Sequence, residues 1–421
     1  MNSRKTIYYI TSLFPVLTQT FVAREIIEME RRGIRIDIIS LKNNPHTTGR
    51  EEMPKADILY IPYFWSLRVW WFALLTLVKY RMRVIRAKCF IISRLRARPL
   101  RILKFMAVLP KTLFLIEYLS RKGADHLHAH WATVPTTCAL FIHRTTGMSF
   151  SFSAHAWDIF VSGNQLLLPE KLDAAERVFT CTRYNLQALL SMGGSSDTVE
   201  LMYHGLETSR YPYRCPAPAE VPLIVAGGSL VPQKGLDYLV TALAAVAAAG
   251  TDFRAKIFGR GGERAKLAAM VESAGLASRV EFTGIMPHRE VVDMLGAADL
   301  FVMPSVSTKD RFIDGLPNVV AEAMACGAAV IASRLSGIPE LIEDGVEGIL
   351  VPPGDPAAIA AAITGLIAEP DRLRGLTRNA RKRVEQQFDV KLNIQPLYRY
   401  LSGKYGGNTG GEAPGDASCA E

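Results

Sequence analysis

Two acids, Asp314 and Glu322, flank the start of an expected helix and are the residues best placed for chemistry. The largely apolar run 299–303 before them predicts a buried strand. A polar loop follows, and Pro317 stands where a helix can begin, because its fixed φ and missing N–H cost nothing there. Gly327 is suited to end that helix. The loop therefore follows the carboxyl end of a strand, where open α/β sheets bind ligands.

The backbone at this helix start predicts an anion site suited to phosphate. The free N–H groups of Leu316, Asn318 and Val319 would point out of the first turn, together with the positive end of the helix dipole. Glu322 lies one turn deeper on the face of Asn318, where its carboxylate can accept hydrogen bonds from the hydroxyls of a ribose. Asp314 could meet hydroxyls on the other side of the phosphates. Spacing alone equally allows a turn-capping Asp314 and a solvated Glu322.

This stretch resembles the acidic motif of retaining glycosyltransferases of the GT-B architecture, specifically family 4. The family pattern of an acid, seven residues and a glutamate is met by Asp314 and Glu322, and the motif continues in Gly337-Ile338-Pro339-Glu340. The resemblance implies an α/β fold of two Rossmann-like, doubly wound domains that face a central cleft. It also implies that Asp314 sits by the donor sugar and that Glu322 holds the ribose. The family usually has Glu at position 314.

A second match lies in the glycine-rich turn 227–235, which resembles V-G-R-L-x-x-x-K-G of the same family. The resemblance implies that Lys234 contacts the diphosphate of the donor and that Gly228 and Ser229 line the donor site. Ser229 stands where relatives carry arginine. Gly259 begins another glycine turn, at which a base and the backbone can approach closely.

The N-terminal third resembles family members that build exopolysaccharides. The loop 14–21, which includes Thr20, matches their F-P-x-x-S/T-E/Q-T-F pattern, and relatives place it near the acceptor and the donor sugar. An ordinary strand-to-helix turn with a threonine cap is the alternative. His155 ends a predicted strand; in similar enzymes the matching histidine faces the donor sugar across the cleft, with Asp158 nearby on the acceptor side.

Three alternating histidines, His126, His128 and His130, share one side of a predicted strand, a spacing that copper or zinc could use. Only Asp125 offers a nearby further ligand, and the phrase resembles a strand of the exopolysaccharide relatives. We therefore expect no metal. The expected co-substrate is a nucleotide-diphosphate sugar, with no other cofactor.

The segment 58–116 combines large apolar side chains with twelve basic residues and has no Asp or Glu, although the net charge of the chain is only +9. Its apolar run 69–78 is shorter than the roughly 20 residues that span a bilayer. Aromatic side chains beside dense Lys and Arg favour a helix that lies in an anionic membrane interface. Helices packed on the sheet with a solvated basic face are the alternative, and none of the common nucleic-acid motifs is present. The expected membrane contacts are Trp65, Arg68, Trp70, Trp71, Arg81 and Arg83.

Composition and the positions of proline-rich segments indicate the domain organisation. A chain of 421 residues with 49% apolar residues predicts two to three domains, and six scattered cysteines without C-x-x-C fit a reducing cytosol. We expect an acceptor-side domain over 1–209, a proline-rich linker over 210–222 and a nucleotide-sugar-binding domain over 223–385. By resemblance, a helix over 386–403 crosses back to the first domain. The polar segment 404–421 is expected to be disordered.

Together these features predict a retaining hexosyltransferase that uses a nucleotide sugar and a lipid-linked or oligosaccharide acceptor. We expect it in the cytoplasm, peripheral on the inner face of the membrane. The alternatives are a non-catalytic GT-B scaffold of polysaccharide assembly and a nucleotide-sugar enzyme or phosphorylase of the same fold. Nucleotide binding would separate the scaffold from the enzymes, and product analysis would separate the two enzymes.

Overall fold

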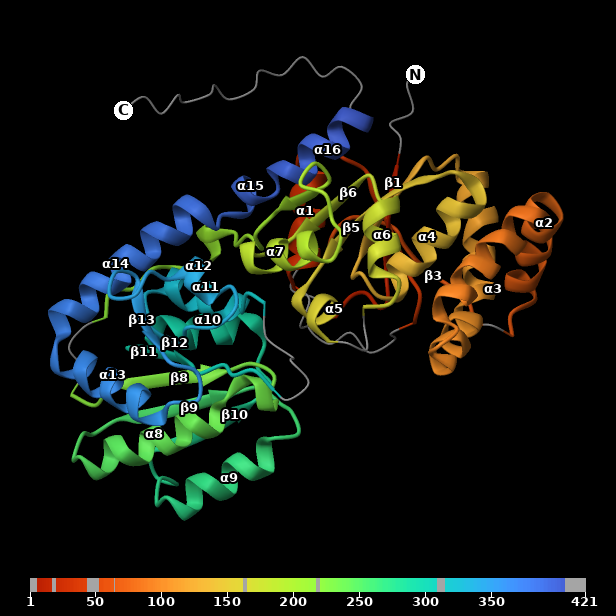
Figure 1. The fold of residues 1–421 in the computed structure, drawn as a ribbon. Coiled ribbons are helices and arrows are strands. Elements are labelled where there is room, and N and C mark those ends of the chain that lie inside the picture. The colour runs from red at the N-terminus through yellow and green to blue at the C-terminus, as the bar shows by residue number, and fades with distance from the viewer. Residues whose placement is uncertain are drawn as a thin grey trace.

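A computed structural model describes residues 6–16, 20–43, 53–63, 65–161, 165–216, 220–308 and 315–405, which form two lobes (Figure 1). Each lobe is built on one parallel sheet. The N-lobe sheet has the strand order β3-β2-β1-β4-β5-β6-β7. Its strands are β1 (Ile7–Thr11), β2 (Ile36–Ser40), β3 (Ile58–Tyr60), β4 (His126–His130), β5 (Ser149–Ala154), β6 (Arg177–Thr180) and β7 (Val199–Leu201).

Helices cover both faces of the N-lobe sheet because its strands bury side chains on both sides. In β1, Tyr8 and Ile10 pack toward α2, α3 and α4, whereas Ile7 and Tyr9 pack toward α1 and α16. The N-lobe helices are α1 (Thr20–Arg31), α2 (Leu67–Leu95), α3 (Pro99–Lys122), α4 (Val134–Thr146), α5 (Ala156–Phe160), α6 (Leu168–Ala174) and α7 (Arg183–Ser191).

The C-lobe repeats this plan, with the strand order β10-β9-β8-β11-β12-β13. Its strands are β8 (Leu223–Gly227), β9 (Arg254–Phe258), β10 (Val280–Gly284), β11 (Leu300–Met303), β12 (Ala329–Ser333) and β13 (Gly348–Val351). α8, α9 and α13 cover one face, and α10, α11 and α14 cover the other. These helices are α8 (Leu236–Ala248), α9 (Arg264–Ser273), α10 (His288–Ala297), α11 (Asn318–Cys326), α13 (Pro356–Ala368) and α14 (Pro370–Gln387), with the short α12 (Ile338–Leu341) and 3-10 turns η1 (Thr208–Arg210) and η2 (Pro232–Lys234).

Two stretches of the chain join the lobes: the one between β7 and β8, and the one that follows α14. The segment 386–403, expected as one crossover helix, is divided among the end of α14, α15 (Val390–Asn393) and α16 (Gln395–Tyr405). The chain breaks there because Asp389 caps α15 and Leu206 pairs with Asp389. α16 packs its Leu397 and Leu401 into the N-lobe core. The expected tail is helical as far as Tyr405, and the rest of it lies outside the described residues.

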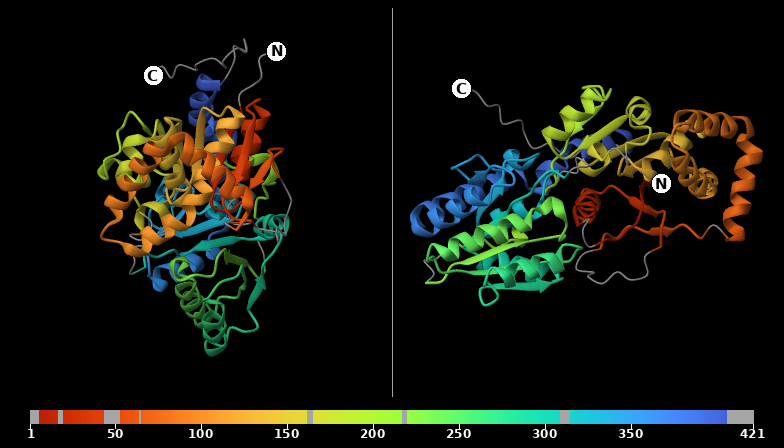
Figure 2. Two further views of the ribbon diagram at one scale, coloured as in Figure 1. Left: turned by 90° about the vertical axis from the view of Figure 1, so that its right-hand side faces the viewer. Right: turned by 60° about the horizontal axis from the view of Figure 1, so that its bottom comes forward.

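The α2–α3 hairpin lies at the end of the N-lobe farthest from the C-lobe, as Figure 1 and the right-hand view of Figure 2 show. α2 bends at Tyr80, whose backbone leaves the helical region (φ −121°, ψ 20°). None of the described helices combines the length and apolar composition that a bilayer-spanning helix requires.

Candidate active site at the seam between the lobes

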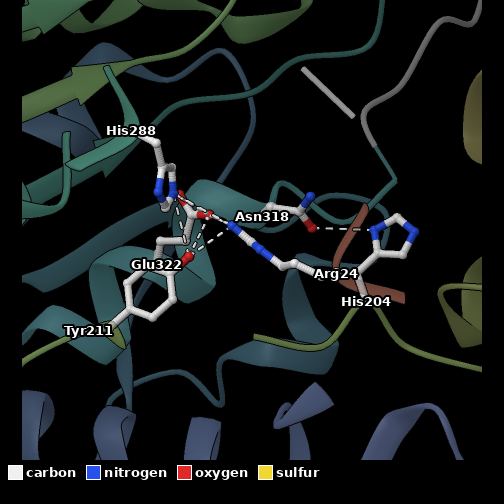
Figure 3. A network of polar contacts seen from close by, with 6 residues as sticks. All are labelled: Arg24, His204, Tyr211, His288, Asn318 and Glu322. Carbon is white, nitrogen blue, oxygen red and sulfur yellow. Dashed lines mark hydrogen bonds and ion pairs between the residues drawn. The ribbon is translucent and has the colours of Figure 1, made fainter. Parts of the chain in front are cut away.

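Glu322 lies at the centre of a polar network that joins the two lobes (Figure 3). Its Oε1 accepts from Arg24 Nη2 of α1 at 2.8 Å and from the Tyr211 hydroxyl of the linker at 3.1 Å. His288 Nε2, at the start of α10, lies 3.3 Å from the same oxygen. Arg24 Nη2 also donates to the Tyr211 hydroxyl at 2.8 Å. One carboxylate thus binds groups from the N-lobe, the linker and the C-lobe.

The network keeps Glu322 ionised although the residue is only 6% exposed. Burial by itself would raise the pKa of its carboxyl, but the His288 hydrogen bond and the charge of Arg24 outweigh it and hold the pKa at about 2. The ion pair between Arg24 and Glu322 raises the pKa of Arg24 against the effect of its own burial. Both side chains are therefore charged at neutral pH.

The start of α11 lies beside this network, and the helix begins at Asn318, one residue after the expected Pro317. The Val320 N–H donates to the Pro317 carbonyl at 2.9 Å, whereas no acceptor among the described residues is found for the N–H of Asn318 or Val319. The Asn318 Oδ1 accepts from His204 Nδ1 of the N-lobe at 3.2 Å. Leu316 is buried and precedes the turn. The helix start therefore points two backbone donors toward the seam.

His155 approaches the seam from the N-lobe, directly after β5. It is 7% exposed, and neither ring nitrogen has a hydrogen-bond partner among the described residues. Its ring centroid lies 5.2 Å from that of His204, which in turn bonds Asn318, and 4.5 Å from that of Trp131. Burial holds the pKa of His155 well below its usual value, so the ring is neutral and offers one N–H and one lone pair. A ligand hydroxyl could bond to either nitrogen.

Gly315, which follows the first expected acid, lies at the same place. A Cβ on Gly315 would lie 3.1 Å from the Cβ of Ala156, the residue after His155. The Gly315 carbonyl accepts from the Gly337 N–H at 3.1 Å. Asp314 itself lies outside the described residues, and its role at the sugar remains a prediction.

Asp158 is fully buried and braces the chain around His155. Its Oδ2 accepts from the backbone N–H of Ala132 at 2.9 Å and of His155 at 3.2 Å. Lys171, also fully buried, donates to the carbonyls of Ala132 and Thr133. Burial raises the pKa of Asp158 and lowers that of Lys171, each to about 7. In this structure Asp158 positions His155 and the turn after β4; its expected place near the acceptor remains a prediction.

The glycine turns of the C-lobe pack tightly at the carboxyl edge of its sheet. A Cβ on Gly259 would lie 1.7 Å from the Gly228 carbonyl oxygen, so only glycine fits there. A Cβ on Gly228 would lie 4.0 Å from Lys234 Nζ, which puts that ammonium group over the turn after β8. Ser229 is exposed. The turn thus carries the cation that the sequence predicts for a diphosphate.

The remaining expected contacts make no hydrogen bond to this network among the described residues. Thr20 is the first residue of α1, four residues before Arg24, and is partly buried. Trp65, Trp70 and Trp71 are 66%, 51% and 59% exposed on the α2–α3 hairpin. The other three expected membrane residues are likewise exposed there: Arg68, Arg81 and Arg83.

Sequence reasoning assigned no role to Arg24, Tyr211 or His288. Arg24 lies in α1, directly after the loop 14–21, and His288 follows the turn after β10 at the carboxyl edge of the sheet. That position was the available signal for His288. Tyr211 stands in a proline-rich linker, yet it is only 2% exposed, because the linker packs along the C-lobe. Nothing in its local sequence indicated that burial.

Among the residues that the structure describes, two groups of side chains could hold a metal ion by distance alone: Glu25, His128 and His130; and His155, Cys181 and His204. His130 Nε2 donates to Glu25 Oε1 at 3.0 Å, and His128 lies between the hydroxyls of Ser151 and Ser153. The first group is thus held by partners of its own. Burial raises the pKa of the Cys181 thiol to about 12, which disfavours the thiolate that a metal would need. The expectation that no metal binds stays a prediction.

The buried His126 predicts a loss of stability in mild acid. Burial lowers the pKa of His126 to about 3, so below about pH 6.5 the unfolded chain takes up a proton there that the folded chain does not. At pH 5.5 this ring should therefore lower the free energy of unfolding by about 1.4 kcal/mol. Asp158, whose pKa burial raises to about 7, takes up a proton in the folded chain over the same range and opposes the histidine, so the test compares two proteins. Urea unfolding of the wild type and of His126→Asn at pH 7.5 and 5.5 should show a change with pH that differs by about 1.4 kcal/mol, with the variant the less sensitive to acid. An identical pH dependence of the two proteins would contradict it.

The two lobes are each built on a doubly wound parallel sheet, and a helix start suited to a ligand lies at the seam between them. This is the GT-B architecture of glycosyltransferases. Sucrose-phosphate synthase from Thermosynechococcus elongatus has a similar fold, with a TM-score of 0.72 and 19% identity over 95% of this chain and 100% of the other. HepE from Anabaena, solved with UDP-glucose, superposes with a TM-score of 0.69 at 19% identity over 94% and 99% of the chains. The expected two-domain GT-B fold is confirmed.

A family model described as Glycosyl transferases group 1 matches residues 214–383, which make up most of the C-lobe, and the resemblance to glycosyltransferases is confirmed. WcaL of Salmonella typhimurium, named for colanic acid biosynthesis, is 34% identical over 216 residues, which are 51% of this chain and 52% of WcaL. A GDP-mannose-dependent phosphatidylinositol monomannoside mannosyltransferase of Mycolicibacterium smegmatis is 34% identical over 55% of this chain and 63% of its own length. The chain spans about half the length of the first of these relatives.

Proposed function

We propose that this protein is a retaining hexosyltransferase that transfers a sugar from a nucleotide-diphosphate donor to a lipid-linked glycan of exopolysaccharide assembly. One observation carries the proposal: the ring of the N-lobe His155, whose nitrogens have no hydrogen-bond partner in the described part of the chain, packs on His204, and His204 bonds to Asn318 at the start of α11. The ionised Glu322 lies one turn further along α11. A neutral imidazole suits a sugar hydroxyl, a helix start suits phosphate and a carboxylate suits a ribose.

In the proposed reaction the donor diphosphate lies at the start of α11 with Lys234 beside it. As the bond between the sugar and the diphosphate breaks, negative charge grows on the leaving diphosphate, and the ammonium group and the backbone N–H groups of Asn318 and Val319 stabilise it. The acceptor hydroxyl oxygen forms the new bond to the anomeric carbon on the face that the diphosphate leaves, and its proton passes to the departing phosphate oxygen. Glu322 accepts hydrogen bonds from the ribose, and Asp314 and His155 hold the sugar. These cations and dipoles belong to the protein, and the proposal includes no metal ion.

The contact made by Arg24 indicates that the two lobes close on each other during the proposed reaction. Because its guanidinium reaches Glu322 from α1, contact between the lobes completes the charge network of the donor site. Closure would also exclude water from the site, because water could otherwise hydrolyse the donor. The arrangement supports a cycle in which lobe closure follows donor binding.

The proposed acceptor side faces a membrane. The names of relatives speak of colanic acid and of a phosphatidylinositol acceptor, both consistent with work at a lipid surface. The α2–α3 hairpin presents Trp70 and Trp71 to solvent beside its basic residues, a pattern suited to an anionic interface. We place the protein at the inner face of the cytoplasmic membrane on these grounds.

The proposal predicts that a nucleotide-diphosphate sugar raises the melting temperature, since a ligand of the folded state stabilises it by mass action. A panel of nucleotide sugars would be screened by thermal shift, and the best donor then assayed for transfer to lipid-linked glycans with and without EDTA. We expect transfer that survives EDTA, and a product that keeps the anomeric configuration of the donor.

One alternative has an observation in its favour. Ser229 is exposed where the family carries a diphosphate-binding arginine, which would suit a non-catalytic scaffold of the same fold. A scaffold should show no thermal shift with any nucleotide sugar, and that outcome would overturn the enzymatic proposal. Phosphorolysis in place of transfer would favour the same-fold phosphorylase.

A further inference from the structure

A pocket of about 810 Å³ opens on the N-lobe where α2, α4 and α6 meet; α4 packs against both of the other helices. Its lining includes Arg83, Arg86, His143, Arg144, Thr145 and Asp173.

The pocket is separate from the seam. Its residue Gly147 precedes β5, and its residue Ala174 precedes β6, so it lies at the amino edge of the sheet. His155 follows the carboxyl end of β5, and a strand of six residues spans about 20 Å. A ligand in this pocket therefore does not occupy the donor site.

The lining is positively charged. Three arginines face a single acid, Asp173, and no described carboxylate lies within ion-pair distance of Arg83, Arg86 or Arg144. The Arg144 guanidinium rests 3.4 Å from the centroid of the Phe90 ring, which fixes its position. Guanidinium groups bind phosphate through paired, charge-assisted hydrogen bonds, so this lining favours a phosphate group.

A second observation points to a ligand. Thr145 lines the pocket and is fully buried, yet its hydroxyl has no hydrogen-bond partner within the described part of the chain. Buried hydroxyls are nearly always hydrogen-bonded in folded proteins. A phosphate oxygen could accept that bond.

We infer that this pocket binds the phosphate of an anionic phospholipid headgroup. On α2, Met82 and Ile85 are 59% and 45% exposed. Met82 stands one turn before Arg86, and Ile85 stands three residues after Met82, so this apolar pair borders the arginine face of the helix. A headgroup in the pocket would thus have apolar side chains next to it to meet the acyl chains. The inference extends the membrane contact proposed above and is independent of the transferase reaction.

The test measures binding of monomeric dihexanoyl-phosphatidylglycerol and of inorganic phosphate to the full chain by calorimetry. The pocket variant is Arg83→Gln, Arg86→Gln and Arg144→Gln together. The matched control removes the same charge from the same hairpin outside the pocket lining, by Arg96→Gln, Arg98→Gln and Lys104→Gln. We expect the pocket variant to weaken lipid binding about tenfold or more, and the control to change it less than about threefold. Unchanged melting temperatures check the fold.

Two further variants separate the outcomes. Thr145→Val keeps the shape of the side chain and removes only the hydroxyl; we expect it to weaken binding of the short-chain lipid about threefold or more. Trp70→Ser with Trp71→Ser should reduce partition onto phosphatidylglycerol vesicles but leave binding of the monomeric short-chain lipid unchanged. The proposed membrane contact and the proposed headgroup pocket are therefore tested separately. Equal losses of lipid binding in the triple pocket variant and the triple control variant would show that the pocket is only a solvated basic surface. Inorganic phosphate binding as tightly as the lipid would overturn the headgroup assignment.

Discussion

Replacing Glu322 by alanine should lower the free energy of unfolding by about 3–5 kcal/mol, because it leaves the buried Arg24 without a counter-ion. It should also abolish measurable donor binding if the carboxylate holds the ribose, since each lost hydrogen bond to a charged group removes about 1.5–3 kcal/mol. Chemical unfolding and titration with the donor measure the two effects separately. Both follow from one fact: Oε1 of Glu322 receives groups from both lobes and from the linker.

A double replacement separates stability from function at this site. Changing Arg24 and Glu322 together to methionine removes both charges and leaves apolar side chains, an exchange that is often neutral or stabilising in buried ion pairs. We therefore expect the double variant to recover most of the stability while donor binding stays lost. The control is Glu281→Ala, which removes a 61% exposed partner of Lys256 and should change stability by less than about 0.5 kcal/mol. Normal donor binding in the double variant would remove Glu322 from the donor site.

Replacing Lys234 by alanine should lower kcat by about 10²–10³, the range found when one preorganised donor to a developing negative charge is removed. The ammonium group lies over the Gly228 turn, on the lobe proposed to hold the diphosphate. The side chain is only partly buried, so the fold should tolerate the change. Steady-state kinetics with the donor identified by thermal shift measure the effect.

A substitution at Ser229, in the same glycine turn as Lys234, tests the diphosphate site by adding a charge. Ser229→Arg restores the cation that relatives carry and should tighten nucleotide-diphosphate binding by about 1–3 kcal/mol. Lys256→Ala removes a lysine of β9 that is 40% exposed and pairs with Glu281, and should leave kcat unchanged. A Lys234→Ala enzyme with full kcat, or equal losses in the two lysine variants, would move the diphosphate away from this turn.

Much of the fold was available from local sequence. The apolar run 299–303 predicted β11 to within one residue, because strand burial is set by short-range patterns. Gly327 ends α11 with a positive φ of 99°, as expected of a residue after a helix. The same reasoning placed His155 at the end of a strand and Glu322 on the first turns of α11.

The partners of these residues could not be predicted in the same way. Arg24 lies 298 positions before Glu322 in the sequence, and they meet only because α16 docks on the N-lobe and the two lobes close. Glu340 likewise reaches across the seam to the N–H groups of Arg183 and Tyr184, at the start of α7. Neither pairing leaves a local signature.

Sequence by itself thus determined which elements form and which side chains stand at their ends. The tertiary structure alone decided which of those ends meet: it buried Asp158 behind His155, buried Tyr211 in what reads as a linker, and gathered three arginines around a pocket on the far edge of the N-lobe. The physical reason is that helix and strand signals act over a few residues, whereas charge pairing and burial depend on how whole sheets and lobes pack.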